Sequence, residues 1–236
     1  MESPSVRPAP DVSSMAGPPR SRRLGWVLAL MFFGAMGFVT ARQNLFWSDD
    51  LTLNYRAHAI APRNVYATTS LAAAVAERGM EGTAMALYQQ ALAVQPKFWR
   101  ANVNLAYLEY ARGNYPEAAR YYSIACDADP TDGDQFLYLG MSLLRMGRFE
   151  EAENAVHSAL LVRPQGKNYH LGLGMVLRGE GKLDEARQEI ARELAADPQN
   201  AQARSLLDQV SRQIEARSRE TTRGLSVAPS GIDVKQ

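Results

Sequence analysis

Residues 99–132 read WRANVNLAYLEYARGNYPEAARYYSIACDADPTD, and the layout of this stretch recurs on both sides of it at an interval of 34 residues. Prolines, glycines and alanines keep the interval, namely Pro62, Pro96, Pro130, Pro164 and Pro198; Gly79, Gly113, Gly147 and Gly181; and Ala84, Ala118, Ala152 and Ala186. A fixed 34-residue period predicts a stack of two-helix units.

Each recurring residue type has a physical role in such a unit. Glycine just past a helix end adopts the left-handed backbone that ends the first helix. Proline ends the second helix because its ring excludes helical continuation. With the proline counted as position 32, positions 8 and 20 hold small residues where the two helices must approach closely. Position 8 holds Ala72, Ala106, Gly140 and Gly174, and position 24 holds a bulky plug, Tyr88, Tyr122, Val156 or Ile190.

The chain thus resembles a tetratricopeptide-repeat (TPR) protein over residues 65–200. The resemblance implies an all-α fold, a right-handed α-solenoid of four helix pairs at 65–98, 99–132, 133–166 and 167–200. The chain departs from the family pattern at position 4, which lacks tryptophan. It departs also at position 27, where Glu193 replaces the alanine of the other units. We expect Glu193 to mark a terminal repeat whose outer face meets solvent or a capping helix.

The flanks of the repeats predict further elements. Residues 47–62 read as a lone leading helix, and residues 201–217 read as a capping helix with apolar residues at helical spacing. Asn64 and Asn200 are expected to cap the helices that follow them. Residues 1–23 and 218–236 are polar or rich in proline and read as disordered tails.

Residues 24–41 carry no charge and would span about 27 Å as a helix, close to the hydrocarbon core of a bilayer. Arg20, Arg22 and Arg23 precede the segment, and Asp49 and Asp50 follow it. The positive-inside rule then predicts a single-pass protein with a cytoplasmic N-terminus and periplasmic or otherwise non-cytoplasmic repeats. The alternative is a signal peptide cleaved after Ala41, which would release a periplasmic assembly factor.

The junction ARQNLFWSDDL at residues 41–51 is similar to the point where the last membrane helix meets the repeats in TPR-containing O-mannosyltransferase-type proteins. Arg42, Asn44, Trp47, Asp49, Asp50 and Leu51 carry this resemblance. It implies repeats outside the cytoplasm. The catalytic half of that family is missing here, so the resemblance implies at most a detached repeat module beside a separate glycosyltransferase.

We find no residue pattern that predicts catalysis, a cofactor or a metal. His58, His157 and His170 lack metal-ligand spacing, and His170 is expected to be a satisfied histidine. Cys126 is expected to be a partly buried, inert thiol. Residues 65–198 hold 13 basic and 17 acidic residues, which argues against nucleic-acid binding.

Positions 2, 5, 9 and 12 of the first helices are expected to line a concave groove that binds a protein or peptide, with Arg145 at its edge. The candidate groove residues are Tyr66, Arg100, Val103, Tyr107, Tyr110, Leu137, Met141, Leu144, Arg145, Leu171, Met175 and Arg178. Their tyrosine, methionine and arginine side chains are typical of interface cores. The alternative is that some of them pack inside the array. The Lys and Asn of the chaperone-type carboxylate clamp are absent, since Val103 and Tyr107, or Leu137 and Met141, take those positions.

Together these patterns predict a non-catalytic, membrane-anchored scaffold for protein–protein interaction. Its partner is a protein or peptide that the sequence does not identify. No nucleic acid or small-molecule substrate is expected.

Overall fold

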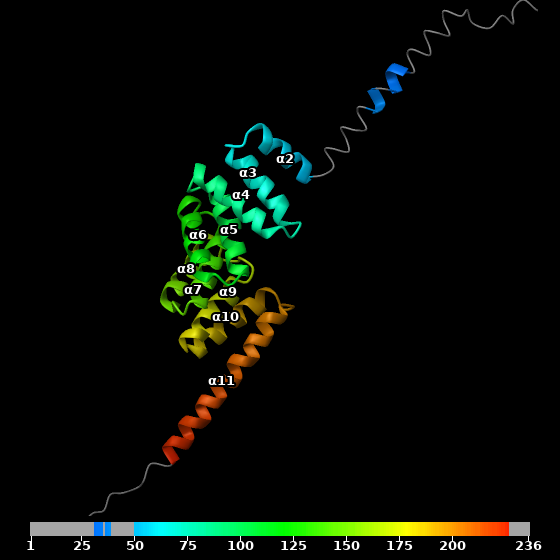
Figure 1. Cartoon of the computed structure of the whole chain (residues 1–236). Coiled ribbons are helices and arrows are strands. Elements are labelled where there is room, and N and C mark those ends of the chain that lie inside the picture. Colours follow the sequence, from blue (N-terminus) through cyan, green and yellow to red (C-terminus); the bar gives the residue numbers. More distant parts are fainter. Residues whose placement is uncertain (1–30, 35, 39–49, 227–236) are drawn as a thin grey trace, which may run out of the picture. The chain divides into compact units, whose positions relative to one another are not determined.

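The computed structural model describes residues 31–34, 36–38 and 50–226. The chain divides into two units, residues 1–53 and 54–236. In the first unit, residues 31–34 and 36–38 are helical. All regular elements in the described part of the chain are helices (Figure 1).

Helix α2 runs over Asp50–Ile60, inside the leading helix that the sequence predicts at 47–62. Residues 47–49 lie outside the described residues. The helix ends at Ile60 because Ala61 precedes a proline, and the residue before a proline is disfavoured in helical conformation. The ring Nδ1 of His58 lies 3.0 Å from the hydroxyl of Thr68, which links α2 to the helix that follows.

Four helix pairs follow α2 and coincide with the four predicted units. Their bounds are α3 Val65–Ala76 and α4 Glu81–Val94, α5 Trp99–Ala111 and α6 Tyr115–Ala128, α7 Gly133–Arg145 and α8 Phe149–Val162, and α9 Tyr169–Glu180 and α10 Leu183–Ala196. Asn64 caps α3 as predicted, since its side-chain oxygen accepts from the backbone N–H of Tyr66 at 2.9 Å. The turn between the helices of each pair holds its glycine at a φ between 73° and 80°, which confirms the left-handed position.

The close contacts within each pair are those that the repeat predicts. The alanines at position 20 are fully buried, and so are the plugs at position 24. A Cβ at Gly140 would lie 2.6 Å from Cγ2 of Val156 and 3.0 Å from the carbonyl oxygen of Ala152. A glycine at this position therefore lets α7 pack against α8 at this distance, because even the methyl group of alanine would be too close.

Of the two surroundings predicted for the outer face at Glu193, solvent and a capping helix, the structure excludes solvent for this side chain. It is 3 % exposed and does not face solvent. Its carboxylate accepts hydrogen bonds from the backbone N–H groups of Asn168 at 2.9 Å and Leu171 at 3.3 Å. These groups lie at the start of α9, where helix N–H groups have no intrahelical partner. A carboxylate from α10 caps α9, so the departure at position 27 has a structural role.

The capping helix is longer than predicted. Helix α11 runs over Ala201–Ser226, nine residues beyond the expected end at residue 217. Ala203, Leu206 and Val210 are buried, and the helix packs against α10 as expected. The apolar pattern ends at Ile214, but the polar residues that follow favour helix through local contacts. Arg219 pairs with Glu215 one turn earlier at 3.6 Å.

Most of the predicted membrane segment lies outside the described residues. Residues 1–23 and 227–236 lie entirely outside them. Among the helices that the structure describes, none has both the length and the apolar character needed to span a bilayer. The described residues of the segment are exposed, including Met31 at 68 % and Phe33 at 70 %.

Candidate functional site

The first helices of the pairs, α3, α5, α7 and α9, carry the predicted groove residues; we call their outward surface the first-helix face. The structure divides the predicted residues by burial. Exposed residues are Tyr66, Arg100, Tyr107 and Arg145, and half-buried residues are Val103, Tyr110, Met141, Leu144, Met175 and Arg178. Leu137 and Leu171 are buried and belong to the core. Position 5 of the third and fourth units therefore packs inside the array, and these two leucines are not available as anchors.

Tyrosines dominate the middle of this face. Tyr107 on α5 is 56 % exposed, and Tyr138 on α7 is 40 % exposed. The ring of Tyr138 stacks on the buried plug Tyr122, with centroids 5.8 Å apart. Burial raises the pKa of Tyr122, and the neighbouring Tyr138, Tyr107 and Tyr110 add to the effect. Tyr138 is not among the predicted groove residues, because its position 6 lies outside the positions expected to line the groove.

Arg145, at the end of α7, is held by two tyrosines from the preceding unit. Its guanidinium carbon lies 5.5 Å from the centre of the Tyr115 ring. The Tyr110 and Tyr115 rings meet edge to face at 5.3 Å. A hydrogen bond with the Tyr110 side chain is the main reason that the pKa of Arg145 is raised. The guanidinium is therefore oriented by aromatic groups and not by a carboxylate.

The other two arginines of the predicted groove are also held without a carboxylate. Arg100 lies 5.1 Å from the centre of the Trp99 ring, and Arg178 donates to the side-chain oxygen of Gln209 at 3.0 Å. Within the part of the chain that the structure describes, Arg100, Arg145 and Arg178 have no acidic group at ion-pair distance. Their charge is available to an incoming anion.

Arginines on the second helices behave differently. Arg120 pairs with Glu117 at 2.7 Å, Arg187 pairs with Asp184 at 3.3 Å, and Arg192 pairs with Glu189 at 2.6 Å. Each pair joins residues three apart on one helix. The arginines of the second helices are therefore neutralised within their own helix, whereas Arg100, Arg145 and Arg178 are not.

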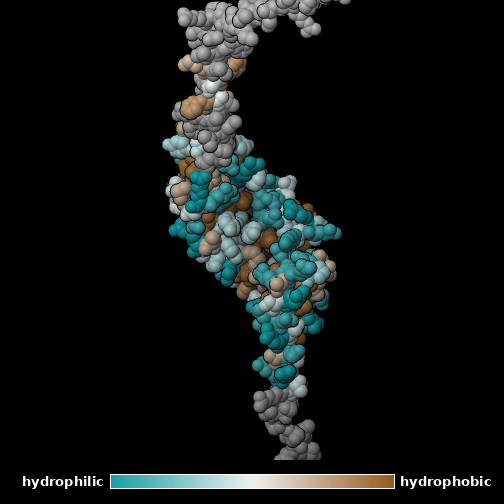
Figure 2. Space-filling view, turned by 90° about the vertical axis from the view of Figure 1, so that its right-hand side faces the viewer, coloured by the Kyte–Doolittle hydropathy of each residue, from teal (hydrophilic) through white to brown (hydrophobic). Residues whose placement is uncertain are grey.

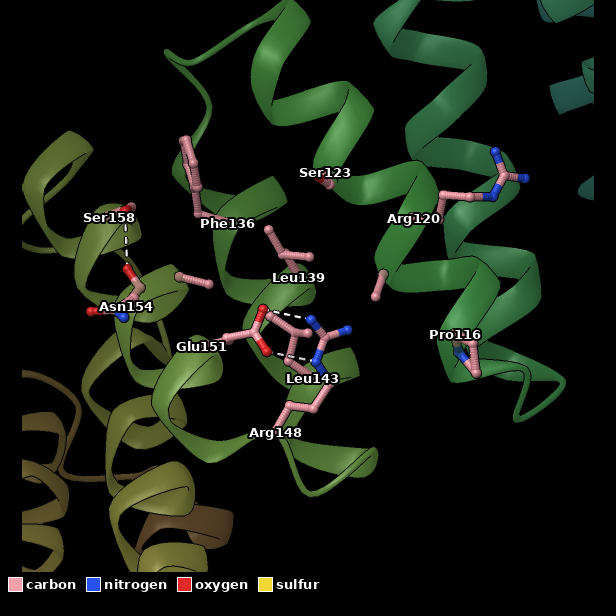
Figure 3. A pocket seen from close by; sticks show the side chains of 12 residues that line it. Pro116, Arg120, Ser123, Phe136, Leu139, Leu143, Arg148, Glu151, Asn154 and Ser158 are labelled. Atoms are coloured by element: carbon pink, nitrogen blue, oxygen red, sulfur yellow. Dashed lines mark hydrogen bonds and ion pairs between the residues drawn. The ribbon is translucent and has the colours of Figure 1, made fainter.

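A second hollow lies on the opposite side, between α6 and α8, with α7 as its floor (Figure 3). It has a volume of about 530 Å³. Phe136, Leu139 and Leu143 form the floor, and Arg148 with Glu151 lies at one end. We call it the α6–α8 groove. No sequence motif marks this groove, because it depends on how the side chains of α6, α7 and α8 pack together.

The histidine and the cysteine that could carry out chemistry, His170 and Cys126, have structural surroundings. Nδ1 of His170 lies 2.8 Å from Oε2 of Glu189 on α10, which makes it the satisfied histidine that was expected. Cys126 is buried, and burial raises the pKa of its thiol to about 12. The described residues contain no cluster of side chains suited to a metal ion. On the face shown in Figure 2, hydrophobic residues are visible between mostly hydrophilic ones.

The geometry defines a class of protein: an α-solenoid that displays one helix of every pair on a common face. The chain belongs to the tetratricopeptide-repeat family, whose profile matches residues 71–133 and 137–201, together more than half of the chain. A comparison with curated proteins found no match.

Solved structures show the same fold. The chain is similar to YrrB, described as a TPR protein with an unusual peptide-binding site, with 22 % identity and a TM-score of 0.61 over 70 % of this chain and 84 % of that one. A TPR protein from Parabacteroides merdae ATCC 43184 has 16 % identity and a TM-score of 0.62 over 80 % of this chain and 74 % of that one. MamA has 17 % identity and a TM-score of 0.58 over 64 % and 88 %.

Proposed function

We propose that the chain is a non-catalytic scaffold that holds an acidic segment of a partner protein against the first-helix face. One observation carries this proposal: within the described residues, Arg100, Arg145 and Arg178 have no carboxylate partner, whereas the arginines on the second helices are paired within their own helix. Unmatched guanidinium groups bind carboxylates well because their N–H donors match carboxylate geometry.

The neighbouring tyrosines supply the apolar part of the contact. Tyr107 and Tyr138 are exposed aromatic groups on adjacent units, and tyrosine offers a large contact area with little loss of side-chain entropy. Arg145 is already oriented by Tyr110 and Tyr115. An acidic segment bound there would find its cation in place, which lowers the entropy cost of association.

We further propose that residues 24–41 anchor the chain in a membrane, with the N-terminus in the cytoplasm and the repeats on the other side. The arginines before the segment and the acids after it support this orientation. The exposed apolar side chains of Met31, Phe33 and Phe38 on the described part of the segment support contact with lipid. Membrane pellets washed with alkaline carbonate should retain the full chain. Release of a chain that begins at Arg42 would instead indicate cleavage.

The binding proposal is tested by photo-crosslinking in intact membranes. A photoreactive amino acid replaces Tyr107 in the full chain, and crosslinked peptides are identified by mass spectrometry. We expect acidic segments, and we expect Arg145→Gln to reduce their capture about tenfold, since a charge-assisted hydrogen bond contributes roughly 1.5–3 kcal/mol. Arg187→Gln, which removes a paired arginine on α10, is the matched control and should capture as wild type does.

Two outcomes would contradict the binding proposal. One is equal capture by Arg145→Gln and wild type at the same melting temperature. The other is a captured set without acidic enrichment. Circular dichroism on the same sample shows whether a variant that loses capture is still folded. This measurement separates a loss of binding from unfolding.

A further inference from the structure

The start of the repeat array is poor in acidic residues. Residues 51–108 hold two of them, Glu77 and Glu81, and both lie at the turn between α3 and α4. The same stretch holds five basic residues, namely Arg56, Arg63, Arg78, Lys97 and Arg100. The next stretch of equal length, residues 109–166, holds nine acidic and five basic residues. The first part of the array is therefore basic, although residues 65–198 as a whole are acidic.

Two of these basic residues lie in neighbouring loops. Arg63 belongs to the loop between α2 and α3, Lys97 belongs to the loop between α4 and α5, and both residues are exposed. The ring of Tyr66 meets the ring of Phe98 edge to face, with centroids 4.8 Å apart, so the two loops lie side by side. Among the residues that the structure describes, no carboxylate lies at ion-pair distance from Arg63 or Lys97.

Uncovered apolar side chains border the same two loops. Ile60, the last residue of α2, is 85 % exposed, and Val94, the last residue of α4, is 50 % exposed. They hold the same position of the repeat, 34 residues apart. The Tyr66 ring is exposed as well. We call Ile60, Arg63, Tyr66, Val94 and Lys97 the basic apolar edge.

The loop between α6 and α7 has a different chemistry at the same repeat positions. Ala128 replaces the larger aliphatic residue, and the loop contains Asp129 and Asp132 but no basic residue. The loop between α8 and α9 follows the exposed Leu161, but its Arg163 pairs with Asp134 at 3.6 Å. Within the described repeats, two adjacent loops with exposed aliphatic residues and unpaired cations therefore occur only at the start of the array.

An edge with this composition complements an anionic lipid surface. Basic residues are attracted to anionic headgroups. Aliphatic side chains gain free energy when they leave water for the interfacial layer, and tyrosine is enriched where a protein meets the headgroups. An acidic protein segment would satisfy the charges of Arg63 and Lys97, but it would give Ile60 and Val94 no apolar surface.

The place of the edge in the chain also favours lipid. Residues 42–49 join the proposed membrane anchor to α2, and a chain of this length reaches at most about 30 Å. Helix α2, with 11 residues, adds about 16 Å before Ile60. A surface held this close to a bilayer meets it at an effective concentration of about millimolar, so that weak contacts are sufficient for docking.

We propose that the basic apolar edge docks on the anionic headgroups of the membrane in which residues 24–41 are anchored. Arg63 and Lys97 contact lipid phosphates, and Ile60 and Val94 enter the interfacial layer. This inference rests on the proposed anchor. Docking restrains the first units of the array, so a partner on the first-helix face is held at a limited distance from the membrane.

The test uses the full chain with Cys126→Ala in lipid nanodiscs, made of phosphatidylcholine alone or mixed equally with phosphatidylglycerol. A nitroxide is attached to Val94→Cys or, as matched control, to Ala128→Cys at the same repeat position. Paramagnetic resonance measures collisions with oxygen, which enters lipid, and with a nickel complex, which stays in water. We expect the label at 94 to favour oxygen in the anionic discs, and the label at 128 to favour nickel in both.

Charge variants test the role of the two cations. Arg63→Gln/Lys97→Gln should lower the ratio of docked to undocked chains about thirtyfold, because each basic residue near an anionic surface contributes roughly fivefold. Added salt should act in the same direction. Arg187→Gln/Arg192→Gln removes the same charge from α10, where both arginines are paired, and should leave the label at 94 in lipid.

The anchor and the docking fail in different ways. A chain that does not copurify with the discs contradicts the anchor and, with it, the docking. A chain that copurifies, but whose label at 94 meets nickel as readily as the label at 128, contradicts the docking alone. A label at 94 that is shielded from both reagents shows that protein covers the edge, and this result also overturns the proposal.

Discussion

The phenol of Tyr169, in the first turn of α9, donates a hydrogen bond of 2.7 Å to Oδ1 of Asp134, in the first turn of α7. Tyr169 is fully buried, and its ring lies against Gly166. A Cβ at Gly133 would lie 2.6 Å from the phenol oxygen, so two glycines make room for this one side chain. Burial raises the pKa of Tyr169, and the bond to Asp134 raises it further. The phenol therefore remains a donor at physiological pH and joins the third unit to the fourth.

Removing that hydroxyl should weaken the array. Tyr169→Phe keeps the ring and loses the hydrogen bond to a carboxylate, which we expect to cost about 1–3 kcal/mol of unfolding free energy. Urea unfolding followed by circular dichroism measures the change. Tyr66→Phe is the control, because Tyr66 is 61 % exposed and its hydroxyl has no partner in the described structure. Equal stability of the two variants would show that the bond contributes nothing.

Two glycines in helices should respond to alanine in opposite directions. Gly140→Ala places a methyl 2.6 Å from Val156 and should destabilise by about 1–3 kcal/mol. Gly82 in α4 has no atom within 4 Å of its would-be Cβ. Gly82→Ala should therefore stabilise by about 0.5–1 kcal/mol through helix propensity. Thermal melts measure the change in melting temperature of each variant. Shifts of the same sign would contradict the close contact between α7 and α8.

Glu193→Ala restores the residue that the other three units carry, yet it should destabilise the chain. The substitution leaves the N–H groups of Asn168 and Leu171 without their acceptor inside the protein, at a cost of about 1–3 kcal/mol. Glu193→Gln keeps one acceptor oxygen and should recover part of the loss. If the alanine variant melts at or above the wild-type temperature, Glu193 is not the cap of α9.

Acid should weaken the contact between α8 and α10. The hydrogen bond from Lys182 is the largest cause that lowers the pKa of Glu153, and His157 adds to it, although partial burial opposes both. Because the pKa is lower in the folded chain, the contribution of Glu153 is present above the ordinary value of 4.5. It is lost as the pH falls through the lowered folded value.

The measurement is the difference in unfolding free energy between wild type and Glu153→Gln from pH 7 to pH 3. We expect up to about 1 kcal/mol at pH 7, as for ion pairs near the surface, and a decline toward zero below pH 4.5. Glu150→Gln removes the same charge from an exposed neighbour on α8 and is the matched control. A difference that stays constant down to pH 3 would be inconsistent with a lowered pKa at Glu153.

The sequence predicts what the repeat itself dictates. The 34-residue interval fixes both helices of every unit, and the glycine, alanine and plug positions are borne out because steric demand at a close helix contact admits few residue types. Features that break the repeat were harder to predict. The capping role of Glu193 depends on backbone groups 22 and 25 residues away, and the helix end at Ser226 depends on local pairs in a polar stretch.

In the candidate sites too, the repeat predicts some features and leaves others unpredicted. The register of the first helices places Tyr107 and Arg145 outward as predicted, but it could not separate Leu137 and Leu171 from the exposed positions, because a shift of a few tens of degrees decides burial. The α6–α8 groove is lined by residues of three successive helices, the small Ala119 and Ala155 among them, and no sequence motif marks such a hollow.

The contacts between the third and fourth units also bear on how the array loses its structure. In a stack whose units touch only their neighbours, cooperativity depends on the coupling energy at each junction. The junction of these two units includes the ion pair of Glu153 with Lys182 at 2.8 Å and the hydrogen bond from Tyr169 to Asp134 at 2.7 Å. Because salt and acid weaken the ion pair, we expect the coupling of the last pair of helices to the rest of the array to fall as the ionic strength rises.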